Sequence, residues 1–125
     1  MNFLILFLGE GIKLDLESVK AVLDQLPGVC DCKSKADCVI ECSYDFGDDS
    51  TIVKVKNDNI TISGTGDASL NLALEIQKAH PAPLRLTDSN LSYEVKLSDF
   101  AHVKELQDWI YNHSSSGLGR LMSED

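Results

Sequence analysis

The chain has 125 residues, of which 43% are hydrophobic and 25% are charged, and its formal net charge is −9. This length and balance are typical of one globular domain with one core, and they exclude an intrinsically disordered chain. The pI of about 4.6 argues against general binding to nucleic acids or anionic membranes, because both need a surplus of Lys and Arg. We expect a single domain over residues 1–113 and a flexible tail over residues 114–125, where Ser and Gly are frequent.

The first recognisable feature is the apolar run Phe3–Leu8. No Lys or Arg precedes it and Gly9-Glu10-Gly11 follows, which is unlike a signal peptide, and it is too short for a membrane helix. A continuous apolar run of this length is typical of a central strand that is buried on both faces. We therefore expect a strand here and a cytoplasmic protein.

Three segments have the apolar periodicity of amphipathic helices. The first follows Asp15 as N-cap and ends at Pro27-Gly28; its apolar positions are Leu16, Val19, Val22, Leu23 and Leu26. The second follows Asp67, is apolar around more than half of its circumference and ends before His80-Pro81, so it should be the better-buried helix. The third begins near Ser98-Asp99, and its apolar face is formed by Phe100, Val103, Leu106 and Ile110.

Strand patterns fill the segments between these helices. Residues 38–46 alternate cleanly, the cluster 47–50 turns the chain, and residues 51–56 and 59–63 form two more strands around a hairpin at Asn57-Asp58. After the second helix we expect an extended stretch at Leu84-Arg85-Leu86, a turn at 87–90 and a strand over 91–97. The order of strand, helix, meander, helix and one or two strands predicts an α+β fold with a ferredoxin-like antiparallel sheet, to which the third helix is an addition.

Four cysteines lie close together, at positions 30, 32, 38 and 42. Their spacing does not match the paired ligands of a zinc site. In a strand over 37–46, Cys38 and Cys42 would lie on the core face with Ile40, so we interpret them as small apolar residues of the core. A metal site and a redox pair remain as alternatives, which elemental analysis for zinc would distinguish in part.

No catalytic motif stands out in this sequence. Ser63-Gly64-Thr65-Gly66-Asp67 joins a strand to a helix as a phosphate loop would, but Ser69 replaces the last glycine and Asp67 places a negative charge where the phosphate would bind. We interpret it as a turn in which Asp67 or Thr65 caps the helix. His102 and Glu105 have the spacing of a surface pair, and His80 marks a helix end. We therefore predict no enzymatic activity, no cofactor and no metal.

The acidic residues are unevenly distributed. Those that suggest a binding surface lie in or near turns of the predicted meander and of the later strands, and they are Glu41, Asp45, Asp48, Asp49, Asp58 and Asp88. Such a group commonly serves only as a solvated, solubilising surface. The alternative is a surface complementary to a basic protein, since carboxylates on rigid turns accelerate association and hold Lys or Arg.

The stretch from Tyr44 to Ile110 resembles small acidic bacterial immunity proteins that are encoded beside polymorphic toxins. The residues that carry the resemblance are Ile62–Leu70, Leu74–Ala79, Pro83–Leu86 and Leu97–Phe100 before an amphipathic helix. The resemblance lies in pattern and order and transfers no functional residue. It implies a stoichiometric inhibitor that binds a cognate, basic toxin domain and blocks its active site or its access to substrate. The alternative function is a ferredoxin-like small-molecule sensor or regulatory dimerisation domain, with the Gly64–Asp67 turn as the place to bind an effector.

Overall fold

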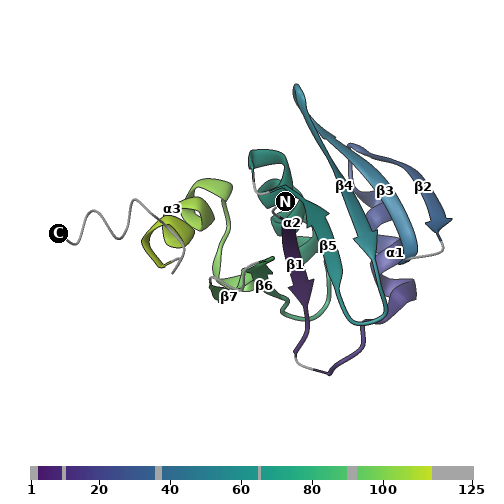
Figure 1. Cartoon of the computed structure of the whole chain (residues 1–125), viewed down its shortest axis with the longest axis horizontal. Helices are drawn as coiled ribbons and strands as arrows, with labels where there is room; N and C mark the ends of the chain where they lie inside the picture. Colours follow the sequence, from purple (N-terminus) through teal and green to yellow (C-terminus); the bar gives the residue numbers. More distant parts are fainter. Residues whose placement is uncertain (1–2, 10, 36–37, 65, 90–92, 114–125) are drawn as a thin grey trace.

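The computed structural model describes residues 3–9, 11–35, 38–64, 66–89 and 93–113, and the side chains of residues 34, 35, 38 and 39 lie outside that description. Within these residues, seven strands form one antiparallel sheet, whose order is β2-β3-β4-β5-β1-β6-β7 (Figure 1). The strands are β1 (Phe3–Phe7), β2 (Val29–Lys35), β3 (Cys38–Phe46), β4 (Asp49–Val55), β5 (Ile60–Ser63), β6 (Arg85–Asp88) and β7 (Glu94–Lys96). The helices are α1 (Leu16–Gln25), α2 (Asp67–Ala79), the 3₁₀ helix η1 (Leu97–Asp99) and α3 (Val103–His113). The predicted α+β class is confirmed, while the sheet is wider and its order differs from the expected plan.

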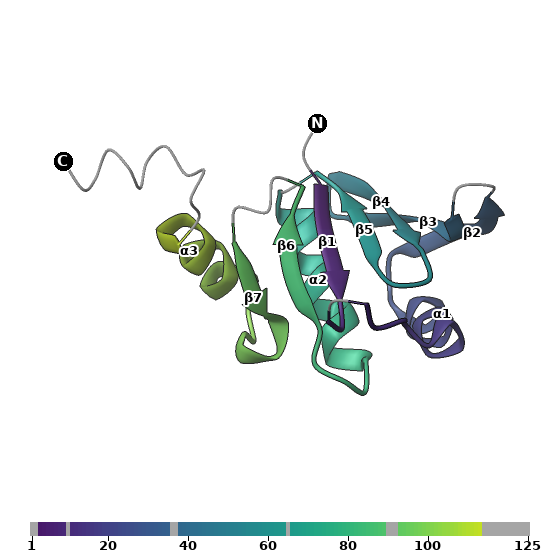
Figure 2. The ribbon, with the colours of Figure 1, turned by 60° about the horizontal axis from the view of Figure 1, so that its bottom comes forward.

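Helices α1 and α2 cover one face of the sheet, and α3 lies beyond the β7 edge (Figures 1 and 2). The core lies between this face and the helices, because every second strand residue points toward them. Leu4, Leu6, Ile60 and Ile62 are fully buried there, together with Leu72 of α2. Burying a side chain of this size stabilises a fold by about 1.5–3 kcal/mol, so this layer supplies most of the driving force for folding.

Strand β1 is central, as predicted, but it is not buried on both faces. Its burial alternates: Leu4 and Leu6 are buried, whereas Phe3, Ile5 and Phe7 are only half-buried. Helices α1 and α2 lie on the same side of the sheet, so among the described residues no helix covers the other side of β1 (Figure 2). We call this uncovered side the open face.

The first two helices are close to their predicted positions. The Asp15 carboxylate accepts a hydrogen bond from the Glu17 backbone N–H at 3.2 Å and so caps α1, as expected. Helix α2 ends at Ala79 and buries eight of its residues, more than the three of α1, which confirms that it is the better-buried helix. None of the described helices is long and apolar enough to cross a membrane.

Four elements of the sheet and helices differ from the predictions. Strand β2 was not expected, because the sequence VCDCKSK has no apolar alternation; the ladder with β3 holds it in place. Thr87 and Asp88 belong to β6 rather than to a turn, since they pair with β7 and β1. The third helix begins only at Val103, because Ser98 and Asp99 form η1 instead. The predicted strand over 91–97 is described from residue 93, and only Glu94–Lys96 form β7.

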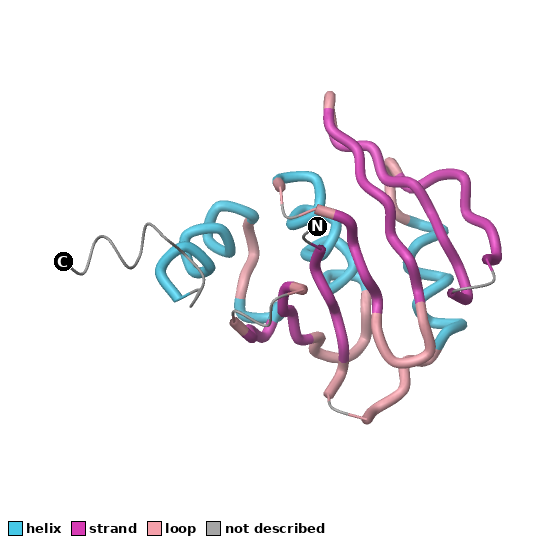
Figure 3. The backbone as a smooth tube through the Cα atoms, viewed as in Figure 1, coloured by secondary structure: helices cyan, strands magenta, loops and turns pink. Residues whose placement is uncertain are grey.

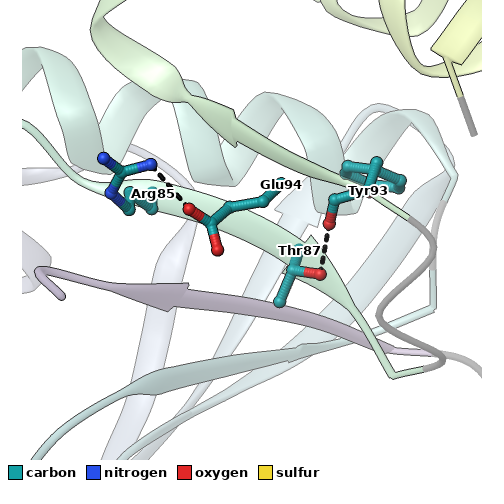
Figure 4. A network of polar contacts seen from close by, with 4 residues as sticks. All are labelled: Arg85, Thr87, Tyr93 and Glu94. Carbon is teal, nitrogen blue, oxygen red and sulfur yellow. Dashed lines mark hydrogen bonds and ion pairs between the residues drawn. The ribbon is translucent and has the colours of Figure 1, made fainter. Parts of the chain in front are cut away.

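Polar contacts close the β6–β7 edge of the sheet (Figure 4). The Arg85 guanidinium lies 2.6 Å from the Glu94 carboxylate, and the Thr87 hydroxyl donates to the Tyr93 carbonyl oxygen. Burial raises the pKa of the Tyr93 phenol, and the nearby Asp88 carboxylate adds to this effect. The polar side chains at this edge are therefore paired with one another. Beside it, Leu106 anchors α3 to the core and is fully buried.

Candidate functional site

Four of the six acidic residues predicted to bind a partner lie on one structural unit, the β3–β4 hairpin. Glu41 and Asp45 are on β3, Asp48 is in the turn and Asp49 begins β4. This hairpin twists away from the rest of the sheet and projects beyond it (Figures 1 and 3). The predicted concentration of acids is thus present in space as well as in sequence.

The other two predicted residues lie elsewhere. Asp58 is in the turn between β4 and β5, at the end of β4 opposite to Asp49. Asp88 is on β6, separated from β4 by β5 and β1, and only 9% of its surface is exposed. Because Asp88 is enclosed, it offers little surface to another protein.

Within the hairpin, the acids differ in their surroundings. Glu41 lies opposite Lys54 in the ladder, and their side chains are 3.9 Å apart. Asp49 accepts a hydrogen bond from the Ser50 backbone N–H at 2.9 Å and lies close to Gly66 at the start of α2, where the helix dipole favours a negative charge. No described lysine or arginine side chain pairs with Asp45 or Asp48. Both residues are exposed, so their carboxylates are accessible from outside the fold.

A groove of about 570 Å³ lies on the open face beside the hairpin. It is lined by Cys30, Asp31, Ser43, Asp45, Ser50, Thr51, Ile52, Ser63 and Gly64. Two of these residues are carboxylates, four have hydroxyl groups and none is cationic. The groove therefore combines negative charge with hydrogen-bonding groups, and Ile52, which is 42% exposed, adds an apolar contact.

One wall of this groove was not predicted from the sequence, because Asp31 and Cys30 belong to the unexpected strand β2. Asp31 has a positive φ of 55°, and the β2–β3 register shifts between Cys30 and Lys33. The local kink is a bulge, which is a common means of redirecting a side chain at a sheet edge. The only available signal in the sequence was the Asp between two cysteines, which has no established structural meaning.

A disulfide bond between Cys32 and Cys42 links this wall to β3. The interpretation of Cys42 as a free thiol of the core was therefore wrong: Cys42 is buried, but it is bonded across the ladder to Cys32. The Cys38 side chain lies outside the described residues, so its predicted role remains a prediction. Among the described residues, no group of His, Cys, Asp and Glu is arranged to hold a metal ion.

The remaining described thiol is that of Cys30, at the rim of the groove. Desolvation raises the pKa of this thiol, and the negative charges of Asp31 and Asp45 raise it further. A thiol with a raised pKa is protonated at neutral pH and is a poor nucleophile. The chemistry of the groove thus favours binding over covalent catalysis.

The opposite wall of the groove is held by a hydroxyl network. The Ser63 carbonyl oxygen accepts hydrogen bonds from the Thr51 hydroxyl at 2.5 Å and from the Ser69 hydroxyl at 2.6 Å. Because Ser69 is on α2 and Thr51 is on β4, these bonds connect the helix, β5 and the hairpin. They make this wall a rigid surface.

Ser63 ends β5 and Asp67 begins α2, so the segment joins a strand to a helix as interpreted, and Gly64 has a φ of 75°. Its capping differs from the prediction: the N-cap of α2 is Gly66, which has no side-chain capping bond, and Asp67 is the first helical residue. The Asp67 carboxylate instead accepts a hydrogen bond from Gln107 and so connects α2 to α3. Thr65 lies outside the described residues.

The histidines and Glu105 have structural contacts. The Glu105 carboxylate accepts hydrogen bonds from the backbone N–H groups of Ala101 and His102, each at 3.2 Å, and thereby caps α3. The Nδ1 of His80 accepts a hydrogen bond from the Ala82 N–H at 3.1 Å, which fixes the connector after α2. Glu105 and His80 thus each stabilise the end of a helix or the connector that follows it.

Comparison of this chain with protein families, with curated proteins and with solved structures finds no match.

Proposed function

We propose that this chain is an immunity-type protein that binds and neutralises a cognate bacterial toxin domain. The observation that carries the proposal is the open-face groove, where Asp31 and Asp45 line a rigid hollow that holds no cationic side chain. Asp48 extends the negative charge to the projecting hairpin turn. A basic protein would supply the Lys or Arg side chains that this surface lacks.

The distribution of charge supports binding to a protein rather than mere solubility. Solubilising charges are usually dispersed, whereas Asp31 and Asp45 are exposed carboxylates that line the same groove and give it a negative potential favourable to a cation. Acidic side chains on a projecting, rigid element also attract a basic partner during encounter. The exposed Ile52 gives the groove an apolar contact that a purely electrostatic surface would lack.

We also infer that β4, β5, β1 and β6, which are neighbours in this order, form the ferredoxin-like part of the fold. On this view α1 and α2 are its two helices, and β2, β3, β7 and α3 are additions. The candidate groove then lies where the added strands β2 and β3 meet β4 and β5, and an addition to a common fold is where a protein would be expected to carry a partner-specific surface.

The proposal is tested by co-expressing this chain with the product of the neighbouring gene and capturing it by affinity. We expect a stable 1:1 complex that inhibits the toxin domain and is weakened about tenfold by Asp45→Asn. The matched control is Asp58→Asn, which removes the same charge at the other end of β4 and should change affinity by less than about twofold. No complex, a complex only at very low salt, or equal effects of the two variants would contradict the proposal.

A cytoplasmic location remains part of the proposal, and the disulfide provides a test of it. Disulfides form mainly in oxidising compartments and are uncommon in the cytoplasm. We expect Cys32 and Cys42 to be reduced when the chain is isolated from cytoplasm under rapid acid quench and alkylation. Complete protection of both thiols from alkylation would place the protein in an oxidising compartment.

A second candidate function is a small-molecule sensor, favoured by the position of Gly64 at the rim of the same groove. Its hydroxyl groups and carboxylates could bind a polar, cationic metabolite as readily as a protein side chain. A thermal-shift screen against metabolites, with light scattering to measure dimerisation, distinguishes the two functions. A stabilising metabolite together with no toxin complex would favour the sensor.

A further inference from the structure

The β3–β4 hairpin has a second hollow on its other side, facing the helices. It has a volume of about 320 Å³ and is lined by Leu26, Pro27, Gly28, Tyr44, Asp45, Phe46, Gly47, Asn71 and Glu75. This volume is at the lower end of the roughly 300–1,000 Å³ typical of small-molecule pockets, so it suits one side chain better than a folded segment. We call it the hairpin pocket.

We propose that the hairpin pocket binds an arginine side chain of the same protein partner. The inference rests on the proposed function, and it adds a specific anchor to a surface otherwise defined by charge. Three features of the pocket carry it: an exposed aromatic ring, a carboxylate in the same lining and a glycine at which two segments of the wall approach each other closely.

The aromatic feature is a pair of parallel rings. Tyr44 and Phe46 lie on the same face of β3, with ring centroids 6.5 Å apart and an interplanar angle of 12°. Tyr44 is buried, whereas Phe46 is 41% exposed. An exposed aromatic face attracts a cation, and the planar guanidinium of arginine stacks on it especially well.

The polar feature comes from α2. Asn71 and Glu75 are one helical turn apart and are both half-buried at the edge of the pocket. The Asn71 amide donates to the Tyr44 hydroxyl at 2.7 Å, which fixes the ring at the floor of the pocket. Glu75 has no described Lys or Arg partner, and its carboxylate is a natural acceptor for the forked N–H groups of arginine.

The third feature is the close approach of the turn after α1 to β3, which depends on Gly28. This residue has a φ of 89°, and a Cβ at this position would lie 2.5 Å from the Asp45 carbonyl oxygen and 3.3 Å from the Tyr44 ring. The Asp45 N–H also donates to the Gly28 carbonyl oxygen at 3.0 Å, which brings the turn after α1 against β3. Glycine is required for this close approach, and the approach forms one side of the pocket.

The chemistry of the pocket selects among occupants. A phosphate or carboxylate would be repelled by Glu75, and no cationic side chain lines the pocket to bind it. An aliphatic side chain would cover Phe46 but leave Glu75 desolvated without a partner, which costs free energy. A lysine ammonium could pair with Glu75, but it would not stack flat on the ring. An arginine side chain can both stack on the Phe46 ring and pair with the Glu75 carboxylate.

The test is an NMR titration of the full chain with N-acetyl-arginine amide, following backbone amides and the Asn71 side-chain amide. The uncharged isostere N-acetyl-citrulline amide is the ligand control. We expect saturable shifts at Phe46, Gly47 and Asn71 with arginine, and at least tenfold weaker binding of citrulline. Equal binding of both ligands would overturn the proposal. Chemical-shift changes confined to the open-face groove at Ser43, Ile52 and Ser63 would also overturn it.

Two variants separate the contributions of the ring and the carboxylate. Phe46→Leu should weaken arginine binding about two- to fivefold, as expected for an exposed cation–π contact. Glu75→Gln should weaken it about tenfold, because it removes a charged hydrogen-bond acceptor. The matched controls are Ile12→Leu, in the loop after β1, where the side chain is 51% exposed and lines neither hollow, and Asp108→Asn, on α3; neither should change binding. Loss of affinity with the controls and not with the pocket variants would also overturn the proposal.

The same variants, measured on a toxin-domain complex, keep the two proposals distinct. If Asp45→Asn weakens the complex while Phe46→Leu and Glu75→Gln do not, the pocket proposal fails and the proposed function survives. If arginine binds the pocket but the neighbouring gene product forms no complex, the proposed function fails and the pocket remains an arginine site.

Discussion

The two ends of the sheet use their polar side chains in different ways. At the β6–β7 end, Arg85 pairs with Glu94 and Thr87 bonds to Tyr93, so the polar groups are used by the fold (Figure 4). At the β2–β3–β4 end, Asp31 and Asp45 line an open groove without a described cationic partner. The polar groups of the first end are thus paired within the fold beside α3, whereas the second end has the acidic groove on which the proposed function rests.

The largest expected effect comes from the anchor of the β6–β7 end. Leu106→Ala removes the fully buried side chain by which α3 contacts the core, and it should lower the free energy of unfolding by about 2–5 kcal/mol. Ile52→Ala at the hairpin end removes a side chain that is 42% exposed and should cost less than about 1 kcal/mol. Urea denaturation measures both. If the two variants lost similar amounts of unfolding free energy, the two ends would not differ in their contribution to stability.

The next effect concerns the disulfide that joins two strands of the β2–β3–β4 end. Reducing the Cys32–Cys42 disulfide, which spans ten positions, should lower the free energy of unfolding by about 2–3 kcal/mol, because the unfolded chain regains conformational freedom. Denaturation with and without dithiothreitol measures the loss, and Cys30→Ser should leave it unchanged. If reductant has no effect on stability, the disulfide does not support this end of the sheet.

The smallest expected effect concerns the Asp15 cap of α1, the helix that lies behind the β2–β3–β4 end of the sheet (Figure 1). Hydrogen bonds from Ser18 lower the pKa of the Asp15 carboxyl, so the charged form is favoured in the folded state. A lowered folded-state pKa stabilises the protein above the unfolded-state value, and this contribution is lost as the pH falls through the folded-state pKa.

Asp15→Ala should therefore lower the Tm by about 3 °C at pH 7, and the difference from the original chain should shrink in strong acid. Thermal denaturation monitored by circular dichroism between pH 7 and pH 2 checks this, with the exposed Asp108→Asn as control. A difference that is independent of pH would contradict capping by the charged carboxylate.

Local patterns in the sequence were sufficient for the elements that contain their own signals. The periodicity of α1 and α2, the cap at Asp15 and the alternation of β3 depend on residues within a few positions of one another, and the structure confirms them. The concentration of acids on the hairpin follows in the same way, because β3, the turn and β4 are contiguous. The sequence alone therefore determined the α+β class and the acidic character of the hairpin, while of the six predicted acids only Asp45 lines the groove.

Only the tertiary structure decided features that depend on distant segments. Strand β2 pairs with β3, and the Cys32–Cys42 disulfide joins the two strands; neither contact is visible in the sequence of β2 itself. The half-burial of Ile5 follows from both helices lying on one face, and the enclosure of Asp88 follows from the position of β6 beside β1. The open-face groove and the hairpin pocket each form where segments far apart in sequence meet. Asp31 could therefore be assigned to the groove, and Glu75 to the pocket, only from the tertiary structure.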